Sequence, residues 1–159
     1  MARVVLVVLI AVLPVVAGGG DCTVDTTRMK PKLSSHALEL RNALFLKACE
    51  NTGGAFIDST DPTLGKRLEP PRGLRLNNSA SNYPVQERWM RHQGNVQLVF
   101  VIDTNGGVTD VTVIESSGHQ LLDEAAVAMW SKARFDVSAK LDGQPIRSLA
   151  YSTVPFTLP

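Results

Sequence analysis

The clearest alternation of apolar and polar positions lies in residues 94–118, GNVQLVFVIDTNGGVTDVTVIESSG. Every second position of its first half is apolar: Val96, Leu98, Phe100 and Ile102. This spacing is typical of a strand with one face on a core. Residues 103–107 contain two glycines and predict a tight turn, so the segment is expected to be an antiparallel hairpin. Val108 is out of phase with the apolar positions of the second strand, which predicts a bulge near Asp110.

Apolar residues at helical spacing predict three helices, over residues 34–49, 84–92 and 120–133. Ser34 or Ser35 is expected to cap the first helix. In the second helix, Val85 and Trp89 share a face that we expect to point into the core. Ser116, Ser117, His119 and Asp123 are interpreted as turn and cap residues of the third helix.

Alternation returns in residues 146–158, which predict a last strand. Pro155 removes a backbone donor, so this strand is expected at a sheet edge. Two short strands are expected near residues 55–57 and 74–76, within a loop-rich linker over residues 51–82. From residue 83 the predicted order is helix, strand, strand, helix, strand. A right-handed crossover then puts the last strand beside the first strand.

The predicted fold class is therefore α+β. We expect a three-stranded antiparallel or mixed sheet with two helices on one face, preceded by a helical N-terminal extension. The predicted organisation is a signal peptide over residues 1–17, an extension over residues 18–82 and a C-terminal domain over residues 83–159.

The N-terminus predicts export. Arg3 precedes an apolar run over residues 4–16, and small residues end at Ala17. A run of about 13 residues is shorter than the roughly 20 that span a bilayer, so a cleaved secretory signal peptide is the favoured interpretation. An uncleaved inner-membrane anchor is the alternative. Two cysteines in an exported chain predict one disulfide, Cys22–Cys49, with a lipidated Cys22 less favoured because Asp21 precedes it.

Charge and candidate chemistry narrow the function classes. The net charge of +1 gives no reason to expect nucleic acid as a partner. The histidines His36, His92 and His119 form no i, i+4 pair, so the sequence predicts no metal site. No nucleophile motif is present, and an enzyme is not expected.

Several short motifs carry a family resemblance by their order and spacing. They are Tyr83-Pro84, Gly94-x-Val96-x-Leu98-x-Phe100, Asn105-Gly106, Ser116-Ser117-Gly118, Leu122-Asp123-x-Ala125-Ala126, Arg134-Phe135 and Asp142-Gly143-x-Pro145. Together they make residues 83–158, roughly half of the chain, similar to the C-terminal domain of the TonB family. The family's long proline-rich spacer is absent, since the nine prolines are scattered.

The resemblance implies a non-enzymatic periplasmic module without a cofactor. Such domains connect inner-membrane complexes to outer-membrane transporters, and they bind an extended segment of the transporter as an added strand. Carried over by position, the expected partner-binding residues are Asn82, Ser148, Leu149, Ala150, Tyr151, Ser152, Thr153 and Val154. The alternative is a structural or dimerising envelope protein, in which the same edge pairs with a second copy.

Overall fold

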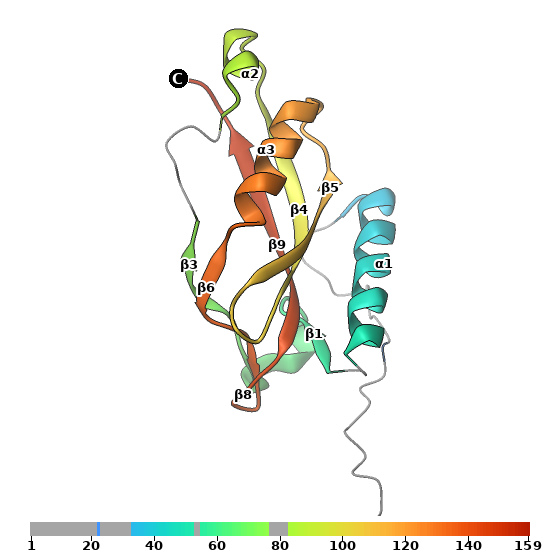
Figure 1. Ribbon diagram of the computed structural model, residues 1–159. Helices are drawn as coiled ribbons and strands as arrows, with labels where there is room; N and C mark the ends of the chain where they lie inside the picture. Colours follow the sequence, from blue (N-terminus) through green and yellow to red (C-terminus); the bar gives the residue numbers. More distant parts are fainter. Residues whose placement is uncertain (1–21, 23–32, 53–54, 77–82) are drawn as a thin grey trace, which may run out of the picture.

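The computed structural model describes residues 22, 33–52, 55–76 and 83–159. Its centre is a four-stranded sheet in the order β1-β9-β4-β5 (Figure 1). The strands are β1 (Phe56–Asp58), β4 (Gly94–Ile102), β5 (Val108–Glu115) and β9 (Arg147–Phe156). Strand β4 is antiparallel to both of its neighbours, whereas β1 runs parallel to β9. The predicted α+β class is confirmed, and the sheet has one strand more than expected.

The predicted hairpin and its bulge are confirmed. Val99 pairs with Thr112 and Val101 pairs with Thr109, so the register shifts by one residue between them. Asp110 lies where the register shifts, and its φ is positive, at 51°. At the turn, Gly106 has φ 81°, and a Cβ placed there would lie 2.1 Å from the carbonyl oxygen of Phe135. The turn therefore needs glycine at this position, because the chain passes too close for any side chain.

Helix α3 (Gln120–Trp130) covers one face of the sheet (Figure 1). Asp123 accepts hydrogen bonds from the Ser117 amide at 2.9 Å and from the Ser116 hydroxyl at 2.5 Å, which tie the preceding turn to the helix. The N-cap residue, His119, makes no side-chain cap hydrogen bond. In the core beneath the helix, the rings of Phe100 and Trp130 stack at 4.4 Å. The buried apolar residues of this face are Val96, Leu98, Phe100, Ile102, Val108, Leu122, Ala126, Trp130, Ala133, Phe135, Ala150, Val154 and Phe156.

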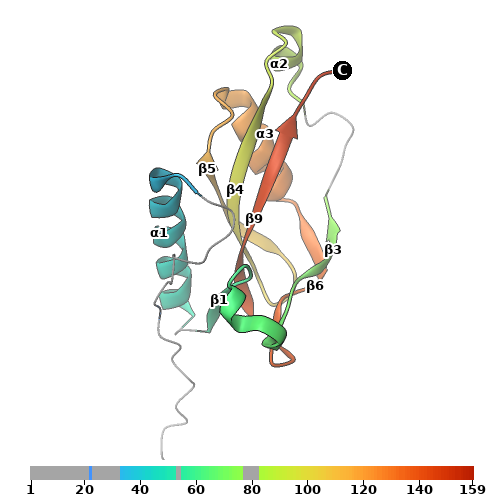
Figure 2. The same cartoon turned by 180° about the vertical axis from the view of Figure 1, so that it is seen from behind.

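Helix α1 (Ser35–Asn51) packs against the other face, and Figure 2 shows it on the side of the sheet away from α3. The Ser34 hydroxyl accepts from the Ala37 amide at 3.2 Å and caps the helix. Of the two helices expected on one face, over residues 84–92 and 120–133, α3 covers that face. The helix expected in the extension is α1, and it covers the second face of the sheet, which Val99 and Val101 make apolar.

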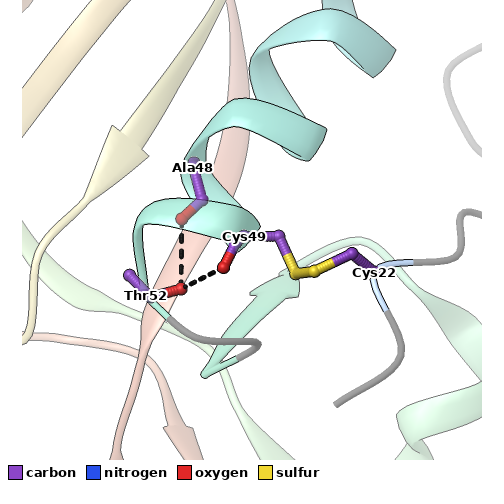
Figure 3. The surroundings of a disulfide bond; sticks show 4 residues. All are labelled: Cys22, Ala48, Cys49 and Thr52. Carbon is purple, nitrogen blue, oxygen red and sulfur yellow. Dashed lines mark hydrogen bonds between the residues drawn. A yellow bond between two sulfur atoms is a disulfide. The ribbon is translucent and has the colours of Figure 1, made fainter. Parts of the chain in front are cut away.

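The predicted disulfide is confirmed: Cys22 is joined to Cys49 in the last turn of α1 (Figure 3). The Thr52 hydroxyl donates to the carbonyl oxygens of Ala48 and Cys49, at 3.0 and 2.9 Å, and closes the end of the helix. The covalent bond therefore ties residue 22 to the helix that covers the second face of the sheet.

Helix α2 (Val85–Trp89) is shorter than predicted, and its orientation was wrongly predicted. Trp89 and Val85 point outward, with 83% and 61% of their surfaces exposed, while Glu87 is only 5% exposed. The helix lies beyond the start of β4, at one end of the molecule (Figure 1), so it does not pack on a face of the sheet. Tyr83 anchors it by an edge-on contact with Phe156 at 5.4 Å.

The extension is part of the same fold. Strand β3 (Arg72–Arg75) pairs with β6 (Arg134–Val137), and β2 (Leu68–Glu69) pairs with β7 (Lys140–Leu141), which also pairs with β8 (Gln144–Pro145). A 3-10 helix, η1 (Pro62–Arg67), precedes β2. The two short strands expected in the linker are thus present as β1 and β3. Among the described residues, none of the helices is long and apolar enough to cross a bilayer, and the expected signal peptide lies outside these residues.

Candidate functional site

The predicted binding edge belongs to β9, whose two sides are paired differently. On the inner side, β4 pairs with residues 148–156 without interruption. On the outer side, β1 pairs only with Arg147, Ser148 and Leu149. Beyond Leu149, no other strand of the described residues pairs with the outer side of β9. We call this outer side of residues 150–156 the open edge.

One hydrogen bond shows which backbone N–H and C=O groups of β9 face the open edge. The amide of Ser59 donates to the carbonyl oxygen of Leu149 at 2.9 Å, so the backbone of Leu149 faces outward, toward β1. Successive residues of a strand present their N–H and C=O groups to opposite sides. The register with β4 is unbroken, so Tyr151, Thr153 and Pro155 also face outward. The open edge therefore presents two N–H groups, of Tyr151 and Thr153, and three carbonyl groups.

Side chains flank the open edge on both faces of the sheet. Leu149 and Tyr151 contact the apolar residues under α1. Ala150, Val154 and Phe156 belong to the core under α3. Thr153 is exposed. An added strand would therefore find apolar neighbours on the α3 face.

The opposite edge of the sheet, on β5, is less suitable for an added strand. The bulge at Asp110 interrupts its regular row of backbone groups. Helix α1 also packs against β5, and the Ser34 amide donates to the Glu115 carboxylate at 3.3 Å. The open edge of β9 carries no charged residue and no bulge. Of the two edges it is the better template for backbone pairing.

A buried charged cluster holds β1 and α1 against β9. The Arg41 guanidinium on α1 forms an ion pair with the Asp58 carboxylate on β1, and both side chains are buried. Arg41 Nε also donates to the Tyr151 hydroxyl at 2.7 Å, and this hydroxyl donates to Asp58 at 3.2 Å. Burial, together with the negative charge of Asp58, raises the pKa of Tyr151 well above its ordinary value.

Sequence reasoning missed Arg41 and Asp58, although a signal for Arg41 is present. Ala37, Arg41, Phe45 and Ala48 are all buried and follow helical spacing. A charged residue within an apolar stripe indicates a buried ion pair, because a buried charge needs a partner. Asp58 gives no comparable signal, since a three-residue strand has too few positions to show a period.

The structure separates the predicted partner-binding residues into groups. Tyr151 and Thr153 present their backbone groups to the open edge. Ala150, Ser152 and Val154 lie in the same stretch, but their backbone groups face β4. Ser148 and Leu149 are buried where β1 pairs with β9, so they are not on the open edge. Asn82 lies outside the described residues.

Comparisons with known proteins show what this chain is similar to. The family model of the Gram-negative bacterial TonB protein C-terminal matches residues 79–158. A protein TonB from Haemophilus ducreyi is 51% identical over 53 residues, which cover 33% of this chain and 18% of that protein. The chain thus matches less than a fifth of the length of this relative.

Two solved structures are also similar. One is the solution NMR structure of the TonB C-terminal domain of Pseudomonas aeruginosa, with a TM-score of 0.43 and 22% identity over 58% of this chain and 88% of that chain. The other is that of Helicobacter pylori, with a TM-score of 0.37 and 22% identity over 51% of this chain and 73% of that chain.

Proposed function

The chain belongs to the family of Gram-negative bacterial TonB protein C-terminal domains, and from this we propose that it is a non-enzymatic periplasmic binding module. It takes an extended segment of a partner protein as an additional strand on the open edge of β9. The partner class is the periplasmic segment of an outer-membrane transporter, which places the protein in TonB-dependent transport. The observation that carries the proposal is the row of outward backbone groups from Tyr151 to Pro155.

The size of the edge limits the segment that it can take. Five residues from Tyr151 to Pro155 span about 16 Å at roughly 3.3 Å per residue. Each backbone hydrogen bond contributes about 1 kcal/mol net, so four or five of them contribute about 4–5 kcal/mol, which offsets little more than the cost of association itself. Apolar side chains beside Ala150 and Val154 would strengthen binding further. Pro155 has no N–H to donate, so pairing is expected to end there.

Amide hydrogen exchange, measured by NMR with a synthetic transporter peptide, tests the geometry residue by residue. The amides of Tyr151 and Thr153 face outward and are expected to become protected when the peptide binds. The amides of Ser152 and Val154 already face β4 and should change little. Equal protection of all four amides, or of none, would contradict strand addition at this edge.

A matched pair of variants tests the backbone contribution directly. Thr153→Pro removes one outward N–H without breaking a bond to β4, and Pro155 at the next outward position shows that this strand tolerates proline. Thr153→Val keeps the N–H and changes only the side chain. We expect the proline variant to bind the peptide about 5- to 10-fold more weakly, as expected for one hydrogen bond, and the valine variant to bind normally. Equal affinities of the two variants would contradict the proposal.

Self-pairing of the same edge is tested in the same samples. Sedimentation velocity of the peptide-free protein at increasing concentration should show a monomer if the edge is kept for a partner. A concentration-dependent dimer that Thr153→Pro abolishes would instead show that the edge serves for self-association.

A further inference from the structure

A cluster of two imidazoles and a carboxylate lies at the junction of α2 and α3. Glu87 belongs to α2, His92 follows that helix, and His119 is the N-terminal cap residue of α3. One ligand atom from each of these residues lies within 4.8 Å of the other two. Residues 87 and 119 are far apart in the sequence, so the fold rather than a local motif brings the cluster together.

We propose that Glu87, His92 and His119 bind a divalent transition-metal ion, for which Zn²⁺ is the best chemical match. Imidazole nitrogen and carboxylate oxygen are both ordinary ligands of zinc, and a set of two histidines and one glutamate leaves the fourth tetrahedral position for water or a ligand. The proposal is independent of the open edge of β9. Nothing in the family resemblance assigns it.

The burial of Glu87 is the first argument. This carboxylate is only 5% exposed, and a buried charge is costly unless a positive partner compensates it. One of its oxygens, Oε2, lies 2.7 Å from Nδ1 of His92 and 4.0 Å from Nδ1 of His119. Two imidazole nitrogens thus approach the same carboxylate oxygen.

The stacking of the two imidazoles is the second argument. The rings of His92 and His119 lie 4.0 Å apart and are nearly parallel, at 13°. Both rings thus bring their Nδ1 atoms toward the same Glu87 carboxylate. Imidazole nitrogen and carboxylate oxygen gathered in this way are a suitable set of ligands for a divalent metal ion.

The backbone around His92 is fixed without the ion. Arg91 has φ 56°, a left-handed conformation that is costly for a residue with a side chain. The turn directs His92 back toward α2, and its amide donates to the Glu87 carbonyl at 3.0 Å. The Tyr83 hydroxyl donates to the His92 carbonyl. Two ligands are thus positioned by backbone contacts, and His119 is positioned by the start of α3.

Metal binding requires only a small adjustment of the side chains. With metal–ligand bonds near 2.0–2.1 Å, ligand atoms in a tetrahedral site lie about 3.4 Å apart. The 2.7 Å separation must therefore open and the 4.0 Å separation must close, each by less than about 1 Å. The two histidine nitrogens lie within 4.8 Å of each other, so they must approach by at most about 1.4 Å as the rings tilt. The histidine side chains are about one-third exposed, at 36% and 30%, so both rings can turn.

Isothermal titration of the full, untagged and chelator-treated chain with Zn²⁺ tests the site. Both cysteines of the chain are in the disulfide and do not compete as thiolates. We expect one ion per chain. His119→Gln should weaken binding by more than the roughly 10- to 100-fold typical of lost outer-shell partners, because it removes a direct ligand. This variant keeps the His92–Glu87 contact, so it is expected to fold.

His36→Gln is the matched control, because His36 is the remaining histidine and is exposed on α1. It should bind Zn²⁺ like the unmodified protein. A ¹⁵N spectrum of the histidine side chains should show that Zn²⁺ shifts the Nδ1 signals of His92 and His119 only. Absence of binding, unchanged binding by a folded His119→Gln variant, or an equal loss in His36→Gln would overturn the proposal.

Discussion

Replacing Arg41 with methionine tests whether the buried ion pair holds β1 and α1 against β9. Methionine has a similar length and no charge, so the change leaves Asp58 buried without its counter-charge. Asp58 keeps three hydrogen bonds, two at 2.7 Å from the Thr60 amide and hydroxyl and one at 3.2 Å from Tyr151. Removal of one partner of a buried pair costs about 3–5 kcal/mol, and these remaining bonds favour the lower value.

A loss of about 3 kcal/mol is large against the roughly 5–15 kcal/mol by which domains are stable. For a chain of this size it lowers the melting temperature by about 6–12 °C. Urea unfolding and calorimetry measure the global effect. Hydrogen exchange at Ile57 and Ser59, whose amides face β9, measures whether β1 separates locally from β9 before the rest of the sheet unfolds.

The double variant Arg41→Met/Asp58→Asn is the control. It removes both charges and keeps an oxygen that accepts from Thr60, and paired removal of buried charges is often close to neutral. We therefore expect the double variant to regain most of the stability lost in Arg41→Met. A single variant that loses less than about 1 kcal/mol, or a double variant as unstable as the single one, would refute the assigned role of the ion pair.

Three further predictions concern the disulfide, the core and the pH dependence. The variant Cys22→Ser/Cys49→Ser should lose about 3.5 kcal/mol in the chain-entropy model, measured by urea unfolding, and two free thiols in the unfolded, unreduced protein would contradict the bond. Phe100→Asp buries a charge without a partner and should prevent folding, so a cooperative melting transition would contradict the position of β4. The folded state holds the Tyr151 proton more tightly than the unfolded state, whose phenol titrates near 10.0. The free energy of unfolding should therefore fall as the pH rises above 10.0, and Tyr151→Phe should remove that part of the decrease.

Strong local patterns explain which elements could be predicted from the sequence. The alternation of Val96, Leu98, Phe100 and Ile102 places β4 in the core, and glycines mark the turn that follows. The disulfide could be predicted from the cysteine count together with the interpretation of the N-terminus as an export signal, because two cysteines have only each other as partners. For β4 and its turn, a few neighbouring residues determine the structure. For the disulfide, the number of cysteines does.

The remaining features depend on contacts that no local pattern records. Val85 and Trp89 have the spacing of a buried helical face, but α2 lies beyond the end of the sheet and both side chains are exposed. The pairing of β1 with Arg147–Leu149 is a tertiary contact of a three-residue strand. Glu87, His92 and His119 come from separate segments, so their convergence required the fold.

The parallel pairing of β1 with β9 has a kinetic consequence. The β4–β5 hairpin closes over a short turn, whereas β1 must find β9 across about 90 residues, and closing a longer loop costs more entropy. Non-local pairings of this kind slow folding, so we expect β1 to join the sheet after β4, β5 and β9. Before that step the outer side of β9 is bare along its whole length and can pair with another unfinished chain. The rate at which β1 joins the sheet then determines how long residues 147–149 of newly synthesised molecules stay open to such pairing.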